Sequence, residues 1–281
     1  MITSVWHKLR QLQLRNSIST PYLSGDLFAK HSDLVVSERS IGNPDLLQSQ
    51  ISSAKIIFCQ SHLLEKFLLA FGEKIRAKVL ICGNSDFDFT QEPKNLPQSI
   101  QFCLFQNLDF RHDKYQVLPI GIENLSLAVN GFPSFFAKSG GDIKKIEKLL
   151  IGPFSPTHSE RNGSVSLHDS LQCSVYFQER LPPKIYQDLI SRYRFVLCPR
   201  GNGIDTHRFW ETLYHGGIPV VMESDWSRNI KDLGIPILEI NAFSSFESQF
   251  QKALADGIHV DPNNIKELWW PYWKEKIQSF S

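Results

Sequence analysis

The chain of 281 residues carries 30 lysine and arginine residues against 29 aspartate and glutamate residues, so its formal net charge is +1. This balance removes any bulk electrostatic argument for a nucleic-acid partner. No apolar run is long enough to cross a bilayer, and the first residues lack the apolar core of a signal peptide. We therefore expect a soluble, cytoplasmic protein, with either two α/β domains of about 140 residues or one large domain.

The cysteines and histidines show no spacing typical of a metal site. The chain has 5 cysteines and 9 histidines, without a CxxC pair or a histidine cluster. Most of the cysteines lie in or beside apolar runs, which is typical of reduced thiols in a core. We expect neither disulfides nor a structural metal from Cys59, Cys82, Cys103, Cys173 and Cys198.

Apolar strands and polar loops alternate through the first half of the chain. A short helix is expected near residues 6–14, and the run AKIIFC at 54–59 predicts a buried strand. The repeated order of strand, loop and helix predicts a parallel sheet with helices on both faces. Further strands are expected at 78–82, 100–104 and 116–120, with a helix at 61–71. Polar loops follow three of these strands and should line one edge of the sheet, at 83–86, 106–107 and 121–124.

The turn-rich segments NGFPS and KSGG, between residues 130 and 141, mark the expected domain boundary. The N-terminal domain would then span 1–140 and the C-terminal domain 141–281. Strands of a second sheet are expected at 149–152, 174–178, 195–198, 218–222 and 235–240, and helices at 182–192 and 246–256.

The tail at about 263–280 is expected to be helical, with Pro271 kinking or dividing it. It is rich in aromatic residues, which suggests a terminal helix that packs back on the N-terminal domain. A helix lying on a membrane surface is the alternative, but the charges mixed among these aromatic residues disfavour it.

The segment 193–223, YRFVLCPRGNGIDTHRFWETLYHGGIPVVME, predicts a strand, a glycine-bearing loop, a helix and a second strand. Asp205 is expected to cap the helix, and two glycines at 216–217 to end it. In open α/β sheets, ligands bind beyond the carboxyl ends of the strands, where helix N-termini point. Backbone amides, a helix dipole and the guanidinium groups of Arg200 and Arg208 would suit a diphosphate there.

The stretch CPRGNGIDTHRFWETLYHGGIPVV resembles the donor-binding motif of exostosin-like glycosyltransferases, which have the GT-B fold. The resemblance covers about thirty residues of the chain. It implies an α/β protein of two Rossmann-like domains separated by a cleft. It further implies a UDP- or GDP-linked sugar as donor, a carbohydrate or glycolipid acceptor, and no metal or other cofactor. Surface polysaccharide or lipopolysaccharide biosynthesis at the inner face of the membrane would fit these substrates.

The resemblance assigns the donor site to the motif residues. Arg200 would neutralise the leaving nucleoside diphosphate, although it could instead pair with a carboxylate at the sheet edge. Arg208 would contact the donor and Glu211 its ribose, or the two could form an ion pair along the helix. A protonated His207 would also favour a diphosphate, but a solvent-facing histidine is equally compatible with the sequence. The loop residues Gly201 and Asn202 resemble part of a nucleotide-binding loop.

Two further groups of residues complete the expected site. In a GT-B enzyme the strand at 149–152 would end at the donor diphosphate, which makes Ser155, Thr157 and Arg161 candidates; a polar surface loop is the alternative. An inverting transfer needs a base from the N-terminal domain. Asp26 and Glu123 are preferred for this role, with Asp86 and Asp88 as further candidates. Asp26 could instead cap a helix, and the Asp86-Phe87-Asp88 motif is not expected to bind metal.

Two other functions fit the same residues. One is a fucosyltransferase-like GT-B enzyme that uses a guanine nucleotide sugar. The other is a non-catalytic protein of the same fold that binds a nucleotide or a glycan. Nucleotide competition would distinguish the first alternative from the exostosin-like enzyme. Donor binding without transfer and without slow donor hydrolysis would indicate the second.

Overall fold

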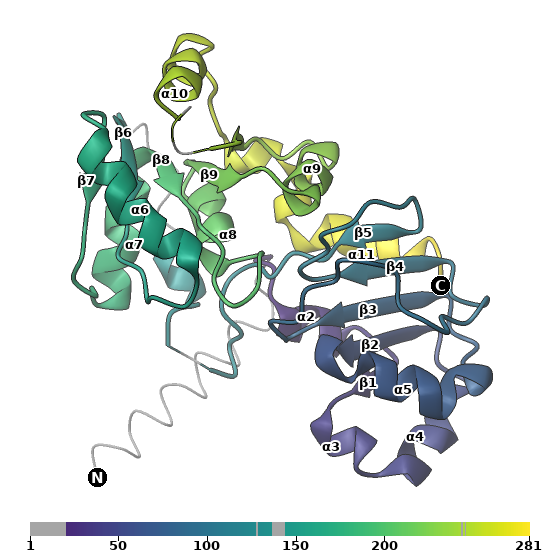
Figure 1. Cartoon of the computed structure of the whole chain (residues 1–281). Helices are drawn as coiled ribbons and strands as arrows, with labels where there is room; N and C mark the ends of the chain where they lie inside the picture. Colours follow the sequence, from purple (N-terminus) through teal and green to yellow (C-terminus); the bar gives the residue numbers. More distant parts are fainter. Residues whose placement is uncertain (1–20, 128, 137–143, 243, 245) are drawn as a thin grey trace, which may run out of the picture.

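The computed structural model describes residues 21–127, 129–136, 144–242, 244 and 246–281. The helix expected near residues 6–14 and the boundary expected at residue 140 lie outside these residues. The described chain contains two parallel sheets of five strands each (Figure 1). This arrangement confirms the predicted α/β fold with two Rossmann-like domains of the GT-B kind.

The first sheet has the strand order β1-β2-β3-β4-β5, and every neighbouring pair is parallel. Its central strands are buried on both faces, as expected from their continuous apolar runs. The strands are Leu34–Val36 (β1), Ile56–Gln60 (β2), Val79–Gly83 (β3), Phe102–Phe105 (β4) and Tyr115–Val117 (β5). Four of them were predicted; the edge strand β1 was not, because three residues are too short to show a period.

The second sheet has the order β10-β9-β8-β6-β7, also parallel throughout. Its middle strand, β8, is the first strand of the motif segment 193–223. All five strands were predicted to within a few residues. They are Ile146–Ile151 (β6), Ser174–Tyr176 (β7), Tyr193–Leu197 (β8), Ile218–Met222 (β9) and Leu238–Ile240 (β10).

Helices connect the strands and cover the sheets (Figure 1). Around the first sheet these are Gly25–Lys30 (α2), Glu38–Ile41 (α3), Pro44–Ile51 (α4) and Leu64–Phe71 (α5). Around the second they are Ser159–Ser170 (α6), Pro183–Arg192 (α7), His207–Tyr214 (α8), Asp225–Asp232 (α9) and Phe246–Ala255 (α10), followed by the terminal helix Trp270–Gln278 (α11).

The start of α8 differs from the prediction. The helix begins at His207 with Thr206 as its N-cap residue, and no side chain caps it. Asp205 instead accepts hydrogen bonds from the Ile120 amide at 2.9 Å and the Trp210 indole at 2.8 Å. Both donors would otherwise be buried without a partner, so their need for an acceptor outweighs the capping preference. Asp205 therefore links the motif to the N-terminal domain.

The end of the chain packs against the first sheet rather than the second. Figure 1 shows α11 lying beside β4 and β5. Trp273 is fully buried in a cluster with Phe28 and Phe58, and the Phe280 ring stacks on Phe102 with centroids 4.5 Å apart. Pro271 lies in the first turn of α11, where the missing N–H is tolerated, so it starts this helix instead of kinking it. None of the described helices is long and apolar enough to cross a membrane.

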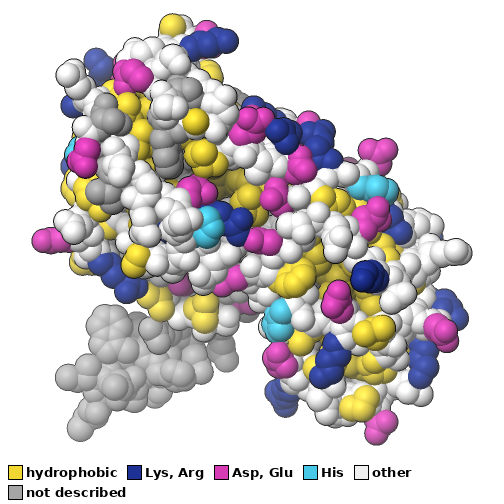
Figure 2. Space-filling view, viewed as in Figure 1, with side chains coloured by type: hydrophobic (Ala, Val, Ile, Leu, Met, Phe, Trp, Pro, Cys, Tyr) yellow, Lys and Arg dark blue, Asp and Glu magenta, His cyan; other side chains and the backbone are white. Residues whose placement is uncertain are grey.

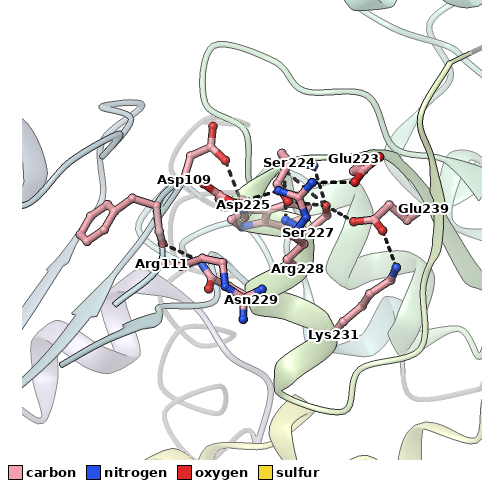
Figure 3. Close-up of polar contacts among 12 residues, drawn as sticks. Asp109, Arg111, Glu223, Ser224, Asp225, Ser227, Arg228, Asn229, Lys231 and Glu239 are labelled. Atoms are coloured by element: carbon pink, nitrogen blue, oxygen red, sulfur yellow. Dashed lines mark hydrogen bonds and ion pairs between the residues drawn. The ribbon is translucent and has the colours of Figure 1, made fainter. Parts of the chain in front are cut away.

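A second set of contacts joins the domains through α9 (Figure 3). Asp109, from the N-terminal domain, accepts a hydrogen bond from the Trp226 amide in the first turn of α9 at 3.0 Å. The Asn229 side chain donates to the carbonyl oxygens of Leu108 and Phe110. These bonds hold the N-terminus and one face of α9 against the loop that follows β4.

The cysteines have the environment expected from the sequence. All five are free; four are buried and Cys173 is half-buried. Cys59 and Cys82 lie opposite each other on β2 and β3, deep in the first sheet. Burial raises the pKa of both thiols, so they remain protonated packing residues.

Candidate functional site

A cavity of about 450 Å³ lies where the two domains meet. Its lining comes from segments that follow the carboxyl ends of β3 and β5 in the first sheet and of β6, β7 and β8 in the second. This is where parallel α/β sheets bind ligands, and the volume suits a small organic molecule. On the face drawn in Figure 2, basic and acidic side chains are interspersed. This face therefore shows no broad basic surface that would attract an anion.

One wall of the cavity is the loop between β6 and α6. Arg161, in the first turn of α6, donates to the carbonyl oxygens of Arg200 at 3.0 Å and Ser155 at 3.1 Å. Burial, reinforced by the nearby positive charge of Arg208, lowers the pKa of Arg161. A Cβ atom on Gly201 would lie 2.6 Å from the Arg161 guanidinium, so glycine is what allows this arginine to approach the motif loop. Ser155 and Thr157 also line the cavity.

Arg208 is oriented by two carbonyl groups and two aromatic rings. Its guanidinium donates to Gly152 O at 3.1 Å and also to Pro153 O. The same group lies 4.3 Å from the ring centroid of Phe154 and 5.2 Å from that of Tyr186. Arginine has five N–H donors, so three remain for a ligand in the cavity.

Glu211 lies one turn beyond Arg208 on α8 and lines the same cavity. Only 4% of its surface is exposed, and burial raises its pKa to about 7, although the Arg208 charge acts in the opposite direction. Within the described chain no ion pair joins the two residues. The ion-pair alternative is thus not the arrangement seen here, and the Glu211 carboxyl group has no described cationic partner.

Arg200 does not line the cavity. Its guanidinium forms an ion pair with Asp88 of the N-terminal domain, and its Nε atom is buried without a partner. This is the carboxylate pairing that the sequence left open as the alternative to a donor contact. The role of Arg200 in binding a donor remains a prediction.

The motif loop after β8 is held by the Asp86-Phe87-Asp88 segment and by Asn107. The Asn202 side-chain amide donates to Asp86 at 3.1 Å, and the Ile204 backbone amide donates to Asp88 at 3.3 Å. Asn107 accepts from the Asp205 amide at 2.9 Å while donating to the carbonyl oxygens of 85 and 87. Two carboxylates from one domain thus fix a loop of the other.

His207 is half-buried at the start of α8 and lines the cavity. Its Nδ1 atom lies 2.9 Å from the carbonyl oxygen of Gly121. Burial lowers its pKa, although Gly121, Glu123 and Asp86 partly oppose the shift. The neutral ring is therefore favoured over the protonated imidazole, and the side chain is only partly exposed.

The two preferred bases occupy different places. Asp26 is in the first turn of α2 but does not cap it; its carboxylate accepts from the Ser126 amide at 3.2 Å, outside the cavity lining. Glu123 does line the cavity. Burial alone would raise the pKa of Glu123, but hydrogen bonds from residues 129–131 outweigh this effect and lower it. The lowered pKa of Glu123 disfavours proton uptake there, and Asp26 lies outside the cavity lining.

Sequence reasoning missed several residues of the cavity. Phe154 and Tyr186 hold Arg208 between them. Asp86, expected only as a further candidate base, does line the cavity from the other domain. Tyr186 lies on α7 beside Ile185, which is 53% exposed and therefore does not mark the buried face of this helix. The spacing of Tyr186 and Ile190, four residues apart, was the signal that indicated the true buried face.

Fold and site together define a two-domain α/β protein with an arginine-lined cavity between its sheets. No family model matches the chain, and no curated protein matches it either. Among the described residues, no cluster of three or more histidine, cysteine, aspartate or glutamate side chains could hold a metal ion.

Proposed function

We propose that the protein is a glycosyltransferase that moves a sugar from a nucleoside-diphosphate donor to a carbohydrate or glycolipid acceptor. The observation that carries this proposal is the meeting of Arg161 and Arg208 in one cavity at the carboxyl ends of β6 and β8. Two guanidinium groups can neutralise a diphosphate as negative charge develops on it during transfer. The resemblance of the motif to exostosin-like enzymes supports the same function.

The remaining groups can be assigned within this proposal. The C-terminal domain would bind the donor, with the carboxyl group of Glu211 accepting hydrogen bonds from ribose hydroxyls. The N-terminal side of the cavity, which includes Asp86 and Glu123, would receive the acceptor. A cytoplasmic location, at the inner face of the membrane where a glycolipid acceptor would lie, belongs to the same proposal, as does a role in surface polysaccharide biosynthesis.

Nucleotide binding tests the proposal directly. Thermal unfolding would be measured with UDP, GDP, CDP and ADP for the wild type and Arg208→Gln. A nucleotide present at 100 times its Kd stabilises the folded state by about 2.7 kcal/mol, which for a protein of this size raises Tm by about 5–10 °C. Loss of charge-assisted hydrogen bonds worth about 1.5–3 kcal/mol should weaken binding in the variant about 10- to 150-fold.

Arg228→Gln is the matched control, because Arg228 is partly exposed and pairs with Glu223 and Asp225 away from the cavity. It should bind nucleotides like the wild type. A preference for GDP would favour the fucosyltransferase-like alternative over a UDP-dependent enzyme. The proposal fails if no nucleotide at millimolar concentration shifts Tm, or if Arg208→Gln binds as tightly as the wild type.

A further inference from the structure

The His207 ring is held in one tautomer by the N-terminal domain. Its Nδ1 atom lies 2.9 Å from the Gly121 carbonyl oxygen, and a carbonyl oxygen can only accept. Nδ1 must therefore carry the proton. In the neutral ring this leaves Nε2 with a free lone pair, as in histidines that serve as general bases.

The free nitrogen is accessible from the cavity. His207 is one of the residues that line the cavity, and its Nε2 atom forms no hydrogen bond with any described residue. The described side-chain atoms that are buried without a hydrogen-bond partner do not include Nε2. Because Nε2 has no partner either, it must keep some contact with solvent. A hydroxyl group of a bound molecule could donate a hydrogen bond to it.

The charges around the ring suit a group that is neutral at rest and takes up a proton. Burial and the positive end of α8 disfavour the imidazolium form before substrate arrives. Asp86 and Glu123, from the N-terminal domain, would stabilise the imidazolium once it forms. On α8 itself, Arg208 opposes the charge and Glu211 supports it when ionised.

The carboxylates that the N-terminal domain brings near the cavity already have hydrogen-bond or ion-pair partners. Glu123 accepts four hydrogen bonds from residues 129–131, and Asp88 is paired with Arg200. Asp86 is the remaining rival from the N-terminal domain, but it is exposed and one of its oxygens already accepts from the Asn202 side chain. An imidazole with a free lone pair has no such competing partner.

We propose that His207 is the catalytic base of the transfer, an inference that rests on the proposed function. Nε2 takes the proton from the acceptor hydroxyl as its oxygen forms a bond to the anomeric carbon of the donor sugar. The bond from that carbon to the diphosphate oxygen breaks, and its electron pair leaves with the nucleoside diphosphate. The imidazolium then returns its proton to water.

His207→Asn tests the proposal, because the asparagine amide can still donate to the Gly121 carbonyl but cannot accept a proton. His259→Asn is the control, since His259 is exposed and outside the cavity lining. Nucleotide affinity would be measured with UDP and GDP. Turnover would be measured as nucleoside diphosphate release from UDP-glucose, UDP-N-acetylglucosamine, UDP-galactose, GDP-mannose and GDP-fucose, with water as the acceptor.

We expect His207→Asn to keep its nucleotide Kd within about threefold while its turnover falls about 10²- to 10⁴-fold. The wild-type rate should fall as pH drops through the lowered pKa of His207, because only the neutral ring accepts a proton. That acidic limb should disappear in the variant. Asp205 and Glu211, each with a pKa raised to about 7 by burial, titrate in the wild type and in both variants.

The outcomes separate the two proposals. If the wild type binds a nucleotide and turns over, but His207→Asn has an unchanged rate, the proposal that His207 is the base is refuted and the transferase proposal is not. The same conclusion follows if His207→Asn loses rate and nucleotide affinity in parallel. A wild type that binds none of the nucleotides, or binds them without turnover, refutes the transferase and the base with it. Nitrogen-15 NMR gives a test without substrate: a proton on Nε2 of the neutral ring overturns the proposal.

Discussion

The hydroxyl of Tyr214 joins three parts of the chain, and its removal has a predictable consequence. The hydroxyl donates to the Leu268 carbonyl oxygen at 2.9 Å and accepts from the Leu23 amide at 3.0 Å. Leu23 belongs to the N-terminal domain, Tyr214 to α8 and Leu268 to the segment before α11. All three residues are buried.

Tyr214→Phe would leave one amide and one carbonyl group buried without a partner. Each unsatisfied group costs about 1–3 kcal/mol, so we expect the free energy of unfolding to fall by about 2–6 kcal/mol. The ring contacts with Tyr22 and Trp269 would remain, because only the oxygen is removed. For a protein of this size the loss corresponds to a Tm decrease of about 4–24 °C.

Urea and thermal unfolding would measure the effect, with Tyr115→Phe as the control. The Tyr115 hydroxyl donates to Glu92 at 3.1 Å, but the Glu92 side chain is 51% exposed, so water can replace the lost bond. The control should lose less than about 1 kcal/mol. If Tyr214→Phe loses no more than the control, the buried amide and carbonyl groups have found other partners and the reasoning is wrong.

Two further predictions concern the contacts between the domains. Asp88→Asn removes the charge paired with the partly buried Arg200, so urea unfolding should show that the free energy of unfolding falls by about 1–3 kcal/mol. A change below about 0.5 kcal/mol, the level of an ordinary surface substitution, would contradict this. Burial raises the pKa of Asp205 from 3.8 to about 7, so the folded state binds more protons and the wild type should lose stability as pH rises from about 4 to 7. Asp205→Asn removes this contribution, so the difference between the urea midpoints of the wild type and the variant should change between pH 5 and 8. A constant difference over this range would refute the prediction.

The sequence predicted the fold well where local patterns are strong. Runs such as IIFC in β2 and FVL in β8 are continuous and apolar, which identifies strands buried on both faces. The helices α6 and α9 were missed because both are mainly polar. The N-terminus of α9 is defined by a capping box at Ser224 and by Asp109, a residue of the other domain.

The site was predictable only in part, for a related reason. The motif places Arg208 and Glu211 on one face of a helix by local spacing, and both do line the cavity. The orientation of Arg200 depends on Asp88, which is distant in sequence. No local pattern reveals such a pairing, because it arises only when the loops after β3 and β8 meet.

The position of α11 affects the order in which the protein can complete its fold during synthesis. The ribosome makes β1 to β5 first, but the helix that covers Phe58, Phe102 and Leu104 emerges only after all the strands of the second sheet. At about 5–20 residues per second, the apolar sheet face stays uncovered for on the order of 10 s. During this interval the nascent first domain would be a natural client for a chaperone. A fragment ending near residue 140 would keep that face uncovered permanently.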